Sequence, residues 1–185
     1  TGTTSGSSQA SAAIHYLADF KFRMVCGYDG STPGILALLR GEVDANSTAW
    51  TTWARNQADD IKSGAIKPVI QFGLKPIKAL PDVPMAMDLI TDAKRKSAFA
   101  FWAASGEIGR SLLAPPNLDQ AKYDALVKAF DDMVVDPGFL ADAEQQSIDL
   151  GIGTGAEMEE AKNLILNSSP DDVALLKTAL EEGFK

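Results

Sequence analysis

The chain has 185 residues, a formal net charge of −8 and a sequence pI near 4.6. Because a nucleic-acid-binding face requires clustered lysine and arginine, this acidic balance argues against a nucleic-acid partner. Apolar residues make up 45% of the chain, as in ordinary globular proteins, and no apolar run approaches the roughly 20 residues that span a bilayer. The single cysteine, Cys26, excludes an intrachain disulfide, and its apolar neighbours predict a buried thiol.

The first part of the chain alternates between the two kinds of secondary structure. Strands are expected at residues 24–26, 43–49 and 66–72, and helices at residues 11–20, 32–41 and in the polar stretch that ends near residue 62. Thr32 suits the cap of the second helix and Pro33 its first position, while Gly64 suits the end of the third. This alternation predicts an α/β fold with a parallel sheet.

The later part of the chain is predicted to be mainly helical. A helical region is expected over residues 84–105, then a short strand at 109–116 and a helix over 118–134. Three further helices are expected to start at Asp136-Pro137, at Thr154 and at Ser169-Pro170, because each site combines a capping residue with proline or a capping-box partner.

Three polar segments are candidates for binding an anion: two lie at expected helix starts, and the third lies at the end of the strand expected at residues 43–49. Free backbone N–H groups and the helix dipole at a helix start favour negative charge, and loops at the carboxyl ends of parallel strands are where open α/β sheets bind ligands. We therefore expect the three segments to converge at one edge of the sheet. The candidate ligand-binding residues are Ser5, Gly6, Ser7, Ser8, Tyr28, Gly30, Ser31, Thr32, Asn46, Ser47 and Thr48.

Several short motifs stand out along the chain, at residues 2–8 before a helix with His15, and at residues 27–30, 38–44, 80–84, 113–116, 136–137, 151 and 154. Read in this order, they resemble motifs of the extracytoplasmic receptors of tripartite tricarboxylate transporters, the Bug family. Each motif is short, but their order and spacing extend over essentially the whole chain.

The resemblance implies a type II periplasmic-binding-protein-like α/β fold with a ligand cleft between two lobes. Residues 1–105 would form one nearly complete lobe, and residues 106–185 would be the mainly helical C-terminal return into the other lobe. The implied function is a periplasmic or otherwise extracytoplasmic solute-binding receptor, or a fragment of one. It would capture a small organic carboxylate and present it to the membrane subunits of a transporter.

Two other classes of function stay open from the sequence. The same fold could serve as an effector-sensing module of a regulator or signalling receptor. A phosphate-handling enzyme built around residues 29–32 is a third reading, although no partner motif accompanies it. We expect no catalytic residues, metal or cofactor. We also expect self-association through the C-terminal helices, whose apolar faces include Tyr123, Leu126 and Phe130.

Overall fold

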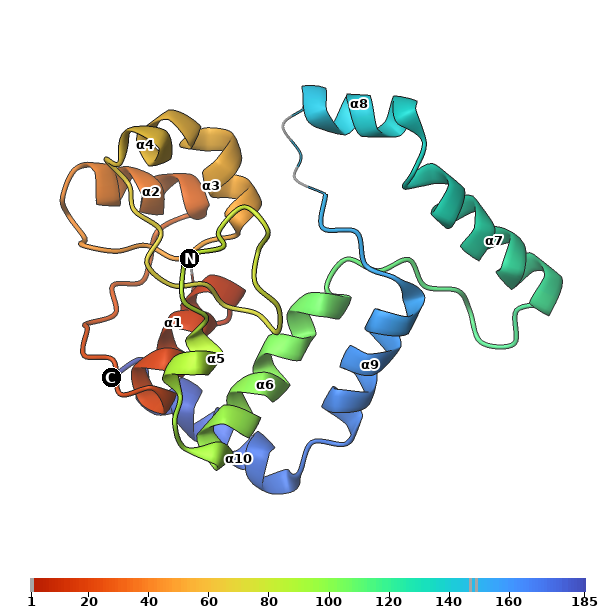
Figure 1. Cartoon of the computed structure of the whole chain (residues 1–185). Helices are drawn as coiled ribbons and strands as arrows, with labels where there is room; N and C mark the ends of the chain where they lie inside the picture. The colour runs from red at the N-terminus through yellow and green to blue at the C-terminus, as the bar shows by residue number, and fades with distance from the viewer. Residues whose placement is uncertain (1, 147, 149) are drawn as a thin grey trace.

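The computed structural model describes residues 2–146, 148 and 150–185, and ten α-helices run through them (Figure 1). Their bounds are α1 Gly6–Leu17, α2 Ser31–Leu39, α3 Trp50–Asn56, α4 Ala58–Ser63, α5 Ala86–Leu89, α6 Ala93–Ile108, α7 Gln120–Met133, α8 Pro137–Gln145, α9 Gly155–Leu166 and α10 Pro170–Glu182.

The predicted α/β fold is wrong, because the described residues form no sheet. Their only strand-like pairing is an isolated parallel bridge between Gln71 and Met85. The segments expected to be strands at 24–26, 43–49 and 109–116 run as irregular chain, and Val25 and Cys26 are exposed. The prediction that the Cys26 thiol is buried is therefore also wrong. Without a neighbouring strand, an apolar segment gains neither ladder hydrogen bonds nor a covered face.

Three of the helix starts predicted from local capping are confirmed, whereas Thr32 does not cap α2, whose N-cap is Gly30. Thr154 and Glu157 form a capping box at the start of α9, and Ser169 and Asp172 form another at α10. Asp136 caps α8, whose first residue is Pro137 as expected. In each case a side-chain oxygen accepts a hydrogen bond from one of the first free N–H groups of the helix, a contact made within four residues.

The core lies where α1, α6 and α10 pack together beside α5, and α9 packs against α6 (Figure 1). Alanine is its commonest residue, and Phe99 and Leu17 are the largest fully buried side chains. Small side chains allow the helices to approach closely, most clearly at Gly183 just after α10. A Cβ added there would lie 2.7 Å from the carbonyl carbon of Ala12 in α1 and nearer still to its oxygen.

A buried glutamine organises the irregular segment between α4 and α5. The Gln71 side chain donates from Nε2 to the carbonyls of Leu80 (3.1 Å) and Val83 (2.7 Å), and its Oε1 accepts from the Ile77 N–H (2.7 Å). Only 4% of Gln71 is exposed. Because a buried amide needs partners, these contacts hold the loop in one conformation beside the core.

Helices α7 and α8 extend away from this core (Figure 1). Neither packs extensively against another helix within the described residues, and α7 has no buried residue. Their apolar faces are therefore largely open to solvent.

Candidate functional site

The start of helix α2 is an uncapped helix end that carries candidate anion donors. Its N-cap residue is Gly30, with φ 97° and ψ −174°, and no side chain caps the first turn. The helix starts at Ser31, so Pro33 occupies the third helical position rather than the expected first. The first N–H groups of a helix have no intrahelical acceptor, and Pro33 has no N–H. Those of Ser31 and Thr32 are therefore available to an acceptor at this helix start.

The predicted segment around Thr48 lies beside this helix start. The hydroxyl groups of Ser31 and Thr48 are 3.0 Å apart and share a hydrogen bond. Asn46 packs against the first turn of α2, where a Cβ added to Gly34 would lie 2.7 Å from Asn46 Nδ2. Two of the three predicted segments are thus brought together by side-chain contact, with no sheet edge involved.

Unpaired polar atoms occur in the same region. Asn46 Oδ1 and Trp50 Nε1 are buried and have no hydrogen-bond partner. A buried polar atom without a partner is costly, so such atoms mark places where a ligand or water would gain hydrogen bonds. Asn46 is among the residues that the sequence predicted to bind the ligand, and Trp50 is not.

The third predicted segment forms the first turn of α1. Ser5 caps this helix by accepting from the Ser8 N–H (3.2 Å), and its hydroxyl donates to Ser8 Oγ (2.9 Å). The Ser7 carbonyl accepts from the Ser11 hydroxyl, and Gly6 is the first residue of the helix. These contacts complete the cap of α1. The expected convergence of all three segments at a sheet edge is wrong, because there is no sheet among the described residues.

The remaining candidate residues lie in the same two segments, around the start of α2 and before α3. Tyr28 is half-buried, and its carbonyl accepts from the Gly30 N–H (3.0 Å). Ser47 is also half-buried, and Thr32 is exposed. A Cβ on Gly30 would meet no heavy atom within 4 Å, so its left-handed φ, rather than crowding, is the reason for glycine here.

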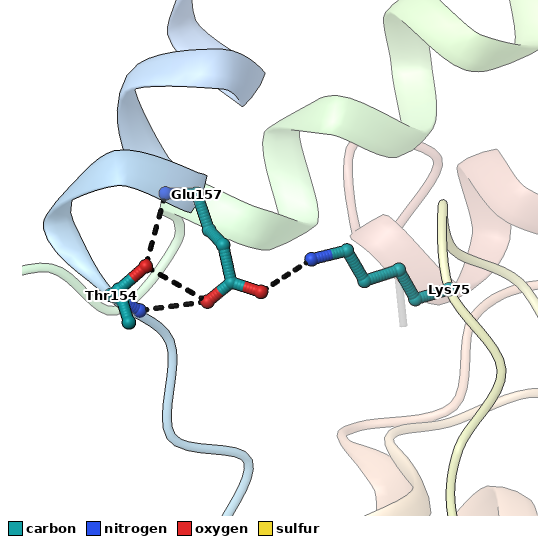
Figure 2. A network of polar contacts seen from close by, with 3 residues as sticks. All are labelled: Lys75, Thr154 and Glu157. Carbon is teal, nitrogen blue, oxygen red and sulfur yellow. Dashed lines mark hydrogen bonds and ion pairs between the residues drawn. The ribbon is translucent and has the colours of Figure 1, made fainter.

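A second polar cluster joins the loop after α4 to helix α9 (Figure 2). Lys75 Nζ lies 2.6 Å from Glu157 Oε1, while the other carboxylate oxygen of Glu157 accepts from the Thr154 N–H (2.9 Å) and hydroxyl (3.1 Å). The hydrogen bond from Lys75, aided by those from Thr154, lowers the pKa of Glu157 to about 2. The same contact raises the pKa of Lys75.

This cluster borders a small cavity of about 130 Å3, which the sequence did not indicate. It is lined by Leu74, Lys75, Glu107, Glu157, Glu160, Ala161 and Leu164. Glu157 was predicted only as a capping residue, since a contact 82 positions away leaves no local pattern. The described residues contain no group of three or more His, Cys, Asp or Glu side chains that could hold a metal.

Comparison of the chain with protein-family models, curated proteins and solved structures gave no match. The family resemblance therefore depends on the sequence motifs alone. Within the part of the chain that the structure describes, no helix combines the length and apolar character that a bilayer crossing requires.

Proposed function

We propose that this chain is an extracytoplasmic solute-binding receptor, or a piece of one, that captures a small organic carboxylate for a tripartite tricarboxylate-type transporter. The sequence motifs supply the family and the transporter partner. The part of the chain that the structure describes is all-helical and does not have the family's two-lobed fold, so the fold does not support the proposal. The proposal is based on those motifs and on the geometry at the start of α2.

The single observation that carries the binding step is the pairing of Ser31 with Thr48 at an uncapped helix start. Two hydroxyls lie 3.0 Å apart at a helix start whose first N–H groups have no side-chain cap, and the helix dipole adds a partial positive charge there. Such donors hold a carboxylate reversibly by hydrogen bonds, and binding requires no covalent step. Because residue 30 is glycine, no side chain covers the start of α2 at this position.

Isothermal titration calorimetry with citrate, succinate, glutamate and benzoate tests the proposal directly. We expect at least one of these carboxylates to bind, and Ser31→Ala to weaken that binding. A hydrogen bond to a charged group contributes about 1.5–3 kcal/mol, so the loss should be roughly ten- to one-hundred-fold in Kd. Thr48→Ala should have a similar effect.

Ser105→Ala is the matched control. Ser105 is an exposed serine whose hydroxyl donates only to the Trp102 carbonyl within α6, so its removal should leave ligand affinity unchanged. If no carboxylate binds, the proposed function fails. If a carboxylate binds and Ser31→Ala and Thr48→Ala both match the control, the function stands but the site is elsewhere.

A further inference from the structure

Helix α7 presents an exposed apolar stripe to solvent. Its residues recur every three or four positions, which places them on one face of the helix. Of these, Tyr123 is 47% exposed, Leu126 59% and Val127 42%, although such side chains are usually covered. We call this face the α7 stripe: Tyr123, Leu126, Val127, Phe130, Met133 and Val134.

The stripe continues a short way beyond α7. Val135 and Leu140 are also exposed, and Leu140 lies on α8. Helix α7 is about 21 Å long, so its exposed face is long enough to pack along a second helix.

The surroundings of the stripe are strongly acidic. Residues 119–146, which hold α7, α8 and their caps, contain seven acidic and two basic side chains, a net charge of −5 out of −8 for the whole chain. Lys128 is already paired with Asp132 at 2.7 Å. Two copies of this face would bring two such negative surfaces together, and like charges across an interface oppose association.

We propose that the α7 stripe is a docking surface for an amphipathic basic helix of another protein. The apolar face of that helix would cover Leu126 and Phe130. Its lysine or arginine side chains would pair with Asp124 and Asp131, whose positions along α7 border one side of the stripe. Charge complementarity selects this occupant over a second copy of the chain, because only a basic partner converts the acidic flanks from repulsion into attraction. This surface is separate from the carboxylate site proposed at α2.

Three synthetic 18-residue peptides test the two parts of the proposal. The first has a leucine stripe flanked by lysine, the second has the same stripe flanked by glutamate, and the third keeps the lysines but has serine in place of leucine. Fluorescence anisotropy should show the first peptide binding at least tenfold more tightly than either of the others. Its affinity should fall as salt is raised from 50 to 500 mM, since exposed charges are then screened.

Leu126→Ser should weaken binding of the first peptide roughly tenfold or more, because a leucine buried on docking contributes that much. Leu112→Ser is the control, since Leu112 is also exposed but lies outside α7. Circular dichroism checks that both variants keep the wild-type helix content. Equal affinities for the two variants, or equal binding of the lysine- and glutamate-flanked peptides, would overturn the proposal.

Light scattering over a range of protein concentrations tests whether a second copy of this chain, rather than another protein, occupies the α7 stripe. The apolar pattern alone led us to expect self-association through these helices, but the net charge of −5 over residues 119–146 opposes it, so we now expect a monomer at all concentrations. A dimer that Leu126→Ser disperses and Leu112→Ser does not would show that the stripe pairs with itself, which would also overturn the proposal.

Discussion

Replacing Gly183 by alanine tests how closely α1 and α10 pack. Gly183 is the C-cap of α10 and has φ −66°, a backbone conformation that alanine adopts freely. The added methyl group would nevertheless lie 2.7 Å from the Ala12 carbonyl carbon and nearer still to the oxygen. Carbon atoms in packed proteins are usually about 3.5–4.0 Å apart, so α1 or the end of α10 must move.

The expected change in the free energy of unfolding is the difference between a steric cost and a gain in backbone entropy. Overpacking by one methyl group costs about 1–3 kcal/mol when backbone has to shift. Alanine in place of glycine recovers only about 0.5–1 kcal/mol of backbone entropy. We therefore expect Gly183→Ala to lower the free energy of unfolding by about 1–2 kcal/mol, and the melting temperature by about 2–4 °C per kcal/mol.

Gly106→Ala is the matched control, because Gly106 lies inside α6 and a Cβ there meets no heavy atom within 4 Å. That substitution should raise stability by about 0.5–1 kcal/mol. Urea unfolding followed by circular dichroism measures both variants against the wild type. If Gly183→Ala proved as stabilising as Gly106→Ala, the close approach of α1 and α10 would be refuted.

Three further predictions concern single residues. Gln71→Met should lower the free energy of unfolding by about 2–4 kcal/mol, since backbone groups of residues 77–83 lose buried partners; an unchanged urea midpoint would contradict this. Carbon-13 NMR should give Glu157 a pKa of about 2, and Lys75→Met should raise that pKa; an ordinary pKa in the wild type would refute the ion pair. Because the pKa of Glu157 is depressed in the folded state, its contribution to stability is present above about pH 4.5 and is lost as the pH falls toward 2. Gly30→Ala should cost about 1–3 kcal/mol, because φ 97° with ψ −174° is a backbone conformation essentially confined to glycine. Full wild-type stability in thermal unfolding would exclude that conformation.

Helices could be predicted from this sequence where their signals are local. The Thr154–Glu157 box and the Ser169 cap place helix starts through contacts within four residues, and the structure has both. The strands could not be judged in the same way, since a strand is stable only beside another strand. Residues 24–26 are apolar enough for a strand, yet no described segment pairs with them.

The candidate site was predictable in its parts but not in its assembly. Ser31 was predicted from its place at an expected helix start and Thr48 from its place at the end of an expected strand. Their 3.0 Å contact, by contrast, depends on how the chain turns between α2 and α3. The ion pair of Lys75 with Glu157 and the unpaired indole of Trp50 are likewise consequences of tertiary packing. Sequence patterns report periodicity along the chain, and these features depend on residues distant in it.

The packing of α1 against α10 has a consequence for folding during synthesis. Helix α1 ends at Leu17, while its partner begins at Pro170. At about 5–20 residues per second, the ribosome needs roughly 8–30 s to make the intervening chain. During that interval α10 cannot yet pack on α1, so the face of α1 that α10 covers in the folded protein, including Ile14 and Leu17, stays partly uncovered. A nascent chain of this protein should therefore present an apolar helix to chaperones until its last helix emerges.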